Sequence, residues 1–402
     1  MSSAIDIGGF DPGDGRLVEG LFVGGFECSC HKLENGTRLD LGLTTRHREL
    51  AHADYRRLAS LGITTSREGA PWPVIPRRAG QYDFSLLLPI VRAAESNRIQ
   101  VIWDLMHFGW PDELDIFAPS FPHHFGAYAD AFAKWLVRES DRVPMLAPIN
   151  EMSYLAWAGG DVRCMNPFAA ARGVELKVQL VRATIAAIEA VRAVFPRARF
   201  VQAEPIINIV PAHEHPKTWR RVESDNLLQY QAWDMLAGRI WPALGGRDDY
   251  LDIIGVNFYP DNQFMLDGTT IRLGARHYKP LSQMLLDVYD RYRRPMLITE
   301  TGAEGQARAP WLRYVSRQSA DAMSKGCELH AITLYPILNH PGWSDDRHCH
   351  NGLWDYADAA GGRAIYHPLA REVRRQAPLL AAARAGMLAR RPSQALQAVR
   401  AT

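Results

Sequence analysis

The stretch Arg294-Pro295-Met296-Leu297-Ile298-Thr299-Glu300-Thr301-Gly302 decides the fold. Its apolar run lies between a proline and a glycine and predicts a strand buried on both faces, which ends on the carboxylate of Glu300. A second stretch, Leu146-Ala147-Pro148-Ile149-Asn150-Glu151, repeats this pattern. Either glutamate alone could simply cap a turn. Two such strands together indicate a barrel of parallel strands, because catalytic residues of that fold lie at the C-terminal ends of the strands.

Apolar runs and helical periodicity extend the pattern over the whole chain. The predicted strands are Leu21 to Phe26, Ile63 to Ser66, Ile99 to Leu105, Met145 to Ile149, Arg199 to Ala203, Leu251 to Val256, Met296 to Ile298 and Leu329 to Leu334. The helices predicted between and after them are Arg46 to Leu61, Phe84 to Asn97, His123 to Ser140, Val174 to Phe195, Asp225 to Leu244, Leu281 to Arg293, Ala309 to Lys325 and Pro368 to Ala383. Strands that alternate with helices predict an α/β protein, a single (β/α)8 TIM barrel over residues 17–383, followed by a C-terminal helix or tail over 384–402.

Composition narrows the class of partner. The 402 residues carry 46 basic and 44 acidic side chains, a net charge of +2, which gives no reason to expect nucleic acid or a membrane surface as partner. No apolar run approaches the roughly 20 residues that span a bilayer, and Met1 to Arg16 reads neither as a secretory signal nor as an anchor. The five cysteines are odd in number and scattered, which predicts reduced thiols and a cytoplasmic protein. The sequence does not indicate an oligomeric state.

Polar side chains follow nearly every predicted strand. They are Glu27, Arg67, His107, Asn150, Glu151, Glu204, Tyr259, Glu300 and Tyr335. Burying such groups without a ligand would be costly, so they predict a functional site rather than a scaffold. Two carboxylates that face one another across the mouth of a barrel suit glycoside cleavage, with retention at a separation of roughly 5–5.5 Å and inversion at a wider one. The sequence leaves this separation open.

These motifs carry a resemblance to a known family. Asn150-Glu151 resembles the Asn-Glu pair that ends strand four of the family 1 glycoside hydrolases of clan A, the β-glucosidase type. The stretch from Thr299 to Gly302 resembles the Thr-Glu-Asn-Gly that ends their strand seven, and the likeness spans roughly Leu21 to Tyr366. It implies a retaining β-glycoside hydrolase that cleaves a β-linked sugar without a cofactor. Glu151 would be the acid/base, with a raised pKa, and Glu300 the nucleophile, ionised beside Arg67.

Other positions follow in register with that family. Arg67 stands where the family keeps an arginine beside the nucleophile, and His107 matches the histidine of its His-Trp-x-x-Pro segment. Asn257-Phe258-Tyr259 matches Asn-Tyr-Tyr, whose last tyrosine donates a hydrogen bond to the nucleophile. The resemblance also implies that Asn150 binds the sugar 2-hydroxyl.

The sequence departs from the family at the residues with which the family binds the outer hydroxyls of the sugar. Its last strand reads Trp-Ser-x-x-Asp-Asn-Phe-Glu-Trp, whereas this chain has the stretch from Tyr335 to Trp343, with Gly342 in place of the gripping glutamate. The first-strand glutamine is also missing, His31 falls near its place, and Glu27 is an added acid. The loop residues Asp345, Asp346, Arg347 and His348 are either replacement contacts or a solvated charged run. We therefore expect poor activity on plain β-glucosides and a glycone altered or extended at those positions.

Three other functions are compatible with the sequence. A transglycosidase would use the same site with another hydroxyl in place of water, and a carbohydrate-binding pseudoenzyme would use the same barrel. A metal-dependent hydrolase would use His107, His340, His348 and His350. A structural metal site formed by Cys28, Cys30, His31, His348, Cys349 and His350 has a spacing typical of no zinc motif. We expect no metal and no cofactor.

Overall fold

The computed structural model describes residues 15–78, 81–213, 215–345 and 347–390. Eight parallel strands close into a barrel in the order β1-β12-β11-β9-β7-β6-β5-β2. Their bounds are β1 Phe22–Gly25, β2 Thr65–Gly69, β5 Gln100–Met106, β6 Met145–Ile149, β7 Arg199–Pro205, β9 Ile253–Asn257, β11 Met296–Thr301 and β12 Leu329–Leu334. The predicted (β/α)8 barrel is confirmed.

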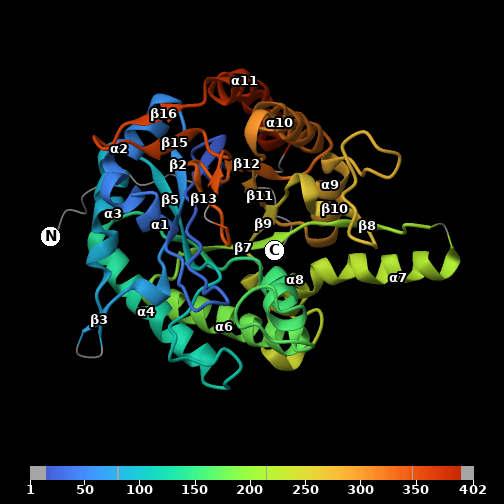
Figure 1. Ribbon diagram of the computed structural model, residues 1–402, viewed down its shortest axis with the longest axis horizontal. Helices are drawn as coiled ribbons and strands as arrows, with labels where there is room; N and C mark the ends of the chain where they lie inside the picture. The colour runs from blue at the N-terminus through green and yellow to red at the C-terminus, as the bar shows by residue number, and fades with distance from the viewer. Residues whose placement is uncertain (1–14, 79–80, 214, 346, 391–402) are drawn as a thin grey trace, which may run out of the picture.

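Helices surround the barrel and cover the outer faces of its strands (Figure 1). They are α2 His47–Ser60, α3 Leu88–Asn97, α4 Phe121–Glu139, α6 Gly173–Val194, α8 Gln231–Leu236, α9 Leu281–Tyr292, α10 Arg308–Ser324 and α11 His367–Ala389. Shorter helices are α1 Leu41–Thr44 and α5 Met152–Leu155, and α7 Pro216–Leu227 projects beyond the ring. Among the described residues, no helix has the length and apolar character needed to cross a membrane.

The loops that connect the barrel strands and helices contain four two-stranded sheets. They pair β3 Arg77–Arg78 with β4 Gln81–Tyr82, β8 Asn208–Val210 with β10 Gln263–Met265, β13 His340–Pro341 with β14 His348–Cys349, and β15 Trp354–Ala357 with β16 Arg363–Ile365. The last two sheets belong to the long connection between β12 and α11, so the loop after the eighth strand is a structured element.

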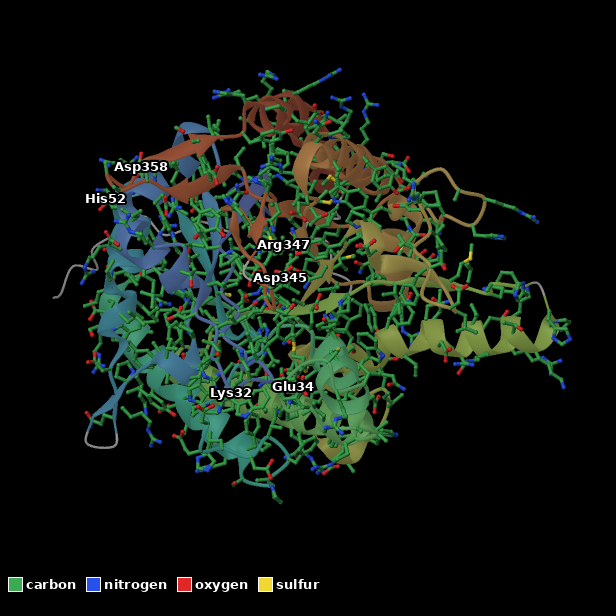
Figure 2. All side chains as sticks on the ribbon, in the orientation of Figure 1. Lys32, Glu34, His52, Asp345, Arg347 and Asp358 are labelled. Carbon is green, nitrogen blue, oxygen red and sulfur yellow. The ribbon has the colours of Figure 1, made fainter. Side chains whose placement is uncertain are left out.

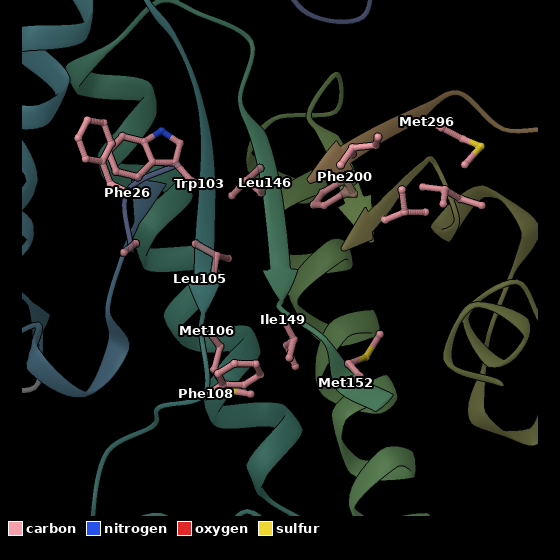
Figure 3. Close-up of a cluster of buried hydrophobic side chains, with 14 of the residues drawn as sticks. Phe26, Trp103, Leu105, Met106, Phe108, Leu146, Ile149, Met152, Phe200 and Met296 are labelled. Carbon is pink, nitrogen blue, oxygen red and sulfur yellow. The ribbon is translucent and has the colours of Figure 1, made fainter. Parts of the chain in front are cut away.

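Apolar side chains fill the barrel on both sides of its wall. The interior contains a small cluster of Leu17, Val18, Val23, Ile102, Met145, Ala147, Val201, Ile253, Leu297 and Ala331. A larger cluster lies between strands and helices, and Figure 3 shows its part around β5 and β6, which includes Trp103 and Leu146. The ring centroid of Trp103 lies 5.6 Å from that of Phe132 on α4. Because both faces of each strand are buried, the strands read as continuous apolar runs in the sequence.

Three polar residues predicted to follow their strands lie inside them. Arg67 pairs in register with Ile102, Glu204 with Val256, and Glu300 with Asn257. Sequence reasoning ended these strands at the first charge, whereas the backbone ladder continues to the rim and does not depend on the side chain. The strands themselves therefore position these groups.

Two helix predictions were wrong in extent. The helix predicted from Asp225 to Leu244 is broken: α7 ends at Leu227, α8 at Leu236, and Gly238 adopts a positive φ of 71° that an α-helix cannot continue through. The last helix, predicted to end at Ala383, runs to Ala389, while residues 391–402 lie outside the described part of the chain.

Candidate active site

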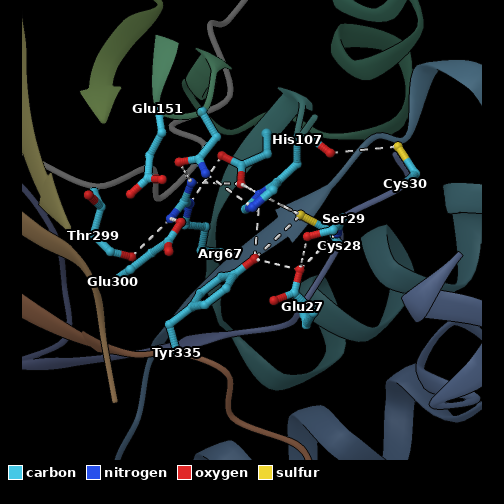
Figure 4. Close-up of polar contacts among 12 residues, drawn as sticks. Glu27, Cys28, Ser29, Cys30, Arg67, His107, Glu151, Thr299, Glu300 and Tyr335 are labelled. Carbon is cyan, nitrogen blue, oxygen red and sulfur yellow. Dashed lines mark hydrogen bonds and ion pairs between the residues drawn. The ribbon is translucent and has the colours of Figure 1, made fainter. Parts of the chain in front are cut away.

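Glu300 lies near the end of β11, and two side chains hold its carboxylate. Arg67 Nη1 donates a hydrogen bond to Oε1 at 2.7 Å, and the hydroxyl of Tyr259 donates to Oε2 at 2.9 Å. Arg67 Nη1 also donates to the carbonyl oxygen of Thr299 at 3.0 Å. Each carboxylate oxygen therefore has a fixed direction. Figure 4 shows Glu300 beside Arg67.

Arg67 is completely buried and binds two carboxylates at once. Besides Glu300, it pairs with Asp104, through Nη2 at 2.8 Å from Oδ2 and Nε at 3.1 Å from Oδ1. Burial lowers the pKa of Arg67, but the charges of Asp104 and Glu300 outweigh it and raise that pKa well above its ordinary value. A buried charge needs such partners, so the loss of one member of this cluster destabilises the others.

Asn150 and His107 extend this cluster along the mouth of the barrel. Asn150 Oδ1 accepts from Arg67 Nη2 at 2.8 Å, which leaves its Nδ2 to donate to His107 Nε2 at 3.1 Å. Nδ1 of His107 then donates to Asp104 Oδ2 at 3.1 Å. The tautomer of His107 is thus assigned from its hydrogen-bond partners.

Glu151 lies directly after β6 and has a different environment from Glu300. Its Oε1 accepts a hydrogen bond from Asn257 Nδ2 at 2.8 Å. Burial and then the negative charge of Glu300 raise the pKa of Glu151 well above its ordinary value, against the opposing effects of Asn257 and Arg67. A buried carboxyl group with a raised pKa suits a general acid.

Glu27 and Tyr335 close the opposite side of the site (Figure 4). Glu27 Oε1 accepts from the Ser29 backbone at 2.9 Å and from the Tyr335 hydroxyl at 3.5 Å. Burial raises the pKa of Glu27, but the nearby imidazoles of His107 and His340 and the bonds from Ser29 outweigh it, so the pKa falls below its ordinary value. The ring of Tyr335 stacks on that of His107 with centroids 5.9 Å apart.

His31 and Trp343 join this site through a series of rings. Their centroids lie 4.9 Å apart, Trp343 lies 5.9 Å from Phe108, and Phe108 lies 4.9 Å from His107. Burial lowers the pKa of His31 to about 4, and its Nδ1 has no hydrogen-bond partner among the described residues. A neutral imidazole with an unpaired nitrogen beside an indole can bind a hydroxyl group.

The charged residues of the loop after β12 pair with one another and with Glu304, which lies in the loop after β11. Arg347 makes a bidentate pair with Glu304, at 2.6 and 3.0 Å, and lies 3.3 Å from Asp345. His348 Nε2 lies 3.0 Å from Asp355 Oδ1. Asp345 and Arg347 project near the centre of Figure 2, whereas His52 and Asp358 lie at its edge. Asp346 lies outside the described residues.

Gly342 has an unexpected neighbour in this loop. A Cβ atom added to it would meet Asp345 Oδ1 at 1.9 Å, so the Asp345 carboxylate fills the space of a side chain at position 342. A glutamate could not replace Gly342 unless Asp345 moved. This chain thus offers a carboxylate near that place from a different residue.

Two groups of possible metal ligands occur among the described residues. Cys28, Asp104 and His107 lie within 4.8 Å of one another at their ligand atoms, as do His348, His350 and Asp355. Asp104 is already paired with the buried Arg67, which disfavours a cation there. The six cysteines and histidines considered from the sequence as one metal site do not come together. Of the four histidines of the metal-hydrolase alternative, His107 lies in the first group, His348 and His350 lie in the second, and His340 lies in neither. The five cysteines are free.

Sequence reasoning missed three members of the site. Asp104 lies inside the apolar stretch of β5, and an acid within a buried strand was the available signal. Asn257 was matched to the family motif but was not assigned to the site, although it ends β9 and binds Glu151. Cys28 was considered only as a metal ligand with other partners, whereas its Sγ lies 3.3 Å from His107 Nδ1 and 3.6 Å from Asp104 Oδ2.

Comparisons with known proteins agree on the fold. No family model and no curated protein matches the sequence. Solved structures do match: a family 1 β-glucosidase from Thermotoga maritima has a TM-score of 0.70 and 16% identity, covering 88% of this chain and 96% of its own. The chain has the fold of the family 1 glycoside hydrolases.

Two more solved structures match with similar values. The T. maritima β-glucosidase in complex with glucoimidazole has a TM-score of 0.71 at 16% identity, covering 89% of this chain and 98% of its own. The AHE enzyme from Alicyclobacillus herbarius has a TM-score of 0.68 at 16% identity, covering 84% and 88%. At this identity the likeness concerns the barrel, so the argument for chemistry rests on the site.

Proposed function

We propose that the protein is a retaining β-glycoside hydrolase, with Glu300 as nucleophile and Glu151 as acid/base. The observation that carries this proposal is the contrast between two neighbouring buried carboxyl groups. Arg67 and Tyr259 hold both oxygens of Glu300, whereas Glu151 has one amide donor and a pKa raised by burial and by Glu300. A carboxylate whose two oxygens are held in fixed directions has the properties of a nucleophile, and a buried carboxyl group with a raised pKa has those of an acid.

The first step breaks the glycosidic bond. Glu300 attacks the anomeric carbon of the sugar, and the proton of Glu151 goes to the departing oxygen, which leaves an alcohol and a glycosyl ester on Glu300. Tyr259 and Arg67, which hold the carboxylate beforehand, keep the attacking oxygen directed at the sugar. In this proposal Asn150, which Arg67 holds, binds the 2-hydroxyl.

The second step releases the sugar. Glu151 has lost its proton and takes one from a water molecule, whose oxygen attacks the anomeric carbon and displaces Glu300. Two displacements restore the β configuration and both carboxyl groups. The cycle needs no cofactor.

Glycone recognition should differ from that of a plain β-glucosidase. Asp345 stands beside Gly342, and Glu27, His31 and Trp343 lie where the first strand and the last loop meet at the site. In place of the family's single glutamate that binds the outer hydroxyls, these groups offer a differently placed carboxylate and an imidazole. We infer a glycone altered or extended at its outer hydroxyls.

A panel of aryl β-glycosides tests this function. Wild-type protein should release the phenol from at least one member, and Glu300→Ala should not. Glu175→Ala removes a carboxylate that pairs with Arg172 on the surface and should retain full activity. Failure of the wild type on glucosides, galactosides, pentosides, deoxy sugars and oligomeric glycones alike would refute the proposal.

A further inference from the structure

A third carboxyl group, Glu204 on β7, is fully buried behind Glu151. Its Oε2 accepts a hydrogen bond from the backbone N–H of Ser153 at 3.0 Å. Its Oε1 has no hydrogen-bond partner among the described residues. A buried carboxyl oxygen without a partner is costly, so its presence beside the acid/base calls for a reason.

The backbone of Glu151 supplies that reason. Glu151 has a φ of 47°, in the left-handed region that a glutamate seldom adopts, and it aims the side chain off the end of β6. Two bonds from β7 hold this turn: the N–H of Glu151 donates to the Ala203 carbonyl at 2.9 Å, and the N–H of Ser153 donates to Glu204. The adjacent residues Ala203 and Glu204 therefore bind the backbone N–H groups of Glu151 and Ser153.

We propose that Glu204 is a positioning residue for Glu151, which it holds in its left-handed turn through the N–H of Ser153. The proposal rests on the proposed function, in which Glu151 is the acid/base. Glu204 does not touch the sugar in this account; it fixes the direction from which the proton is delivered. A displacement of the acid by about 1 Å can cost roughly 10²-fold in rate, so the support of the turn matters.

The charge of Glu204 adds a second effect. Burial raises the pKa of Glu204 to about 7, although the bonds from Ser153 and the ammonium group of Lys177 lower it. When ionised, Glu204 raises the pKa of Glu151, in addition to burial and the charge of Glu300. The other titratable or charged groups that act on this pair are Arg67 and Tyr259 at the mouth, Tyr154 on α5 and Lys177 on α6.

Two variants separate position from charge. Glu204→Ala removes the acceptor for Ser153, and Glu204→Gln keeps an oxygen there but removes the charge. For glycosides with poor leaving groups, which need the proton, Glu204→Ala should lower kcat about 10-fold or more. For activated aryl glycosides, the kcat of this variant should stay within about threefold of the wild-type value. Glu204→Gln should recover most of the lost rate on the poor leaving groups. KM should change little, because Glu204 is not placed against the sugar.

A matched control lies two residues earlier on the same strand. Gln202 is also fully buried, its Oε1 also lacks a partner among the described residues, and it binds the Tyr250 carbonyl rather than the turn at Glu151. Gln202→Leu should change both substrate classes by the same factor. If Glu204→Ala behaves like this control, or if Glu204→Gln recovers nothing, the positioning role is wrong.

The pH dependence gives a readout that survives if Glu204→Ala fails to fold. In Glu204→Gln the alkaline limb of kcat/KM should move to lower pH, because a negative charge near Glu151 is lost and the acid gives up its proton earlier. An unmoved limb would contradict the coupling. If wild-type protein hydrolyses no glycoside, the proposed function fails instead.

Thermal unfolding of the same pair of proteins then tests Glu204 without a substrate. A carboxyl group with a folded-state pKa of about 7 and an ordinary value of 4.5 loses its contribution to stability as the pH rises between these values. Wild-type Tm should thus fall relative to that of Glu204→Gln between pH 5 and about 8. Parallel curves would show that Glu204 is not the buried, titrating group described here.

Discussion

The cluster around Arg67 and the loop after β12 are both rich in charge, yet they differ in burial and in their partners. Arg67, Asp104 and Glu300 are buried, and every hydrogen bond of the guanidinium goes to a site residue. Arg347, Asp345 and Glu304 are largely exposed, with 54%, 54% and 43% of their side-chain surfaces accessible. Arg347 pairs with Asp345 of its own loop and with Glu304 of the loop after β11. The first region matches the family motif and the second departs from it. Under the proposed function, this difference assigns the chemistry to the barrel and the recognition of the sugar to its rim.

The largest expected effect comes from neutralising the centre of the buried cluster. Arg67→Met leaves Asp104 and Glu300 buried without their cation, which should cost on the order of 3–5 kcal/mol of unfolding free energy. Activity should fall by roughly 10³-fold or more, since the nucleophile loses its orientation. Denaturant unfolding and aryl glycoside kinetics measure the two effects.

Arg347→Met is the matched variant in the exposed loop. Exposed ion pairs contribute little to stability, so its Tm should stay within a few degrees of wild type and its activity within about threefold. Equal damage from both variants would break the distinction between the two regions.

Glu151→Ala should produce an effect that depends on the leaving group. Only poor leaving groups need a proton in the first step, so kcat/KM should fall roughly 10²–10⁴-fold for alkyl glycosides and much less for activated aryl glycosides. A series of substrates of graded leaving-group pKa measures the slope. Equal losses across the series would assign the acid to another residue.

The pH profile should show the raised pKa of Glu151. Catalysis needs Glu151 protonated, so kcat/KM should fall as the pH rises through that pKa, which burial and the charge of Glu300 place well above the ordinary range. The alkaline limb should disappear in Glu151→Ala assayed on activated substrates. A limb that persists there belongs to a different group.

Smaller effects should come from the loop, and they sharpen the comparison. Gly342→Glu alone should impair binding, because its side chain meets Asp345 Oδ1, which lies 1.9 Å from the added Cβ. The double variant Gly342→Glu, Asp345→Ala restores the family's carboxylate and should raise kcat/KM for β-glucosides by about tenfold relative to wild type. No gain in the double variant would show that this place does not read the sugar.

Asp345→Ala and His348→Ala alone should shift the preference among glycones by only a few-fold, because both side chains are partly exposed. Asp358→Ala, at the edge of the molecule, is their control. If neither loop variant changes the order of preferred glycones, the loop is a solvated surface.

The sequence predicted the barrel and the inner site because both depend on local patterns. The runs ending at Asn150-Glu151 and at Glu300 are apolar on both faces, and the polar residue that follows necessarily reaches the rim. Asp104 and Cys28 were not predicted as site residues, because their contacts with Arg67 and His107 join separate segments of the chain and no local pattern specifies them. The same holds for Asp345, since its approach to Gly342 follows from the folding of the whole loop.

The most direct test of the central claim is to trap the intermediate. A 2-deoxy-2-fluoro β-glycoside with an activated leaving group slows release of the sugar, so intact-mass spectrometry should show one added fluoroglycosyl group. Peptide sequencing should place it on Glu300, and Glu300→Ala should take up none. Covalent label on Glu151 or elsewhere, or turnover that gives the inverted sugar without any label, would contradict the assignment of Glu300 as the nucleophile of a retaining glycosidase.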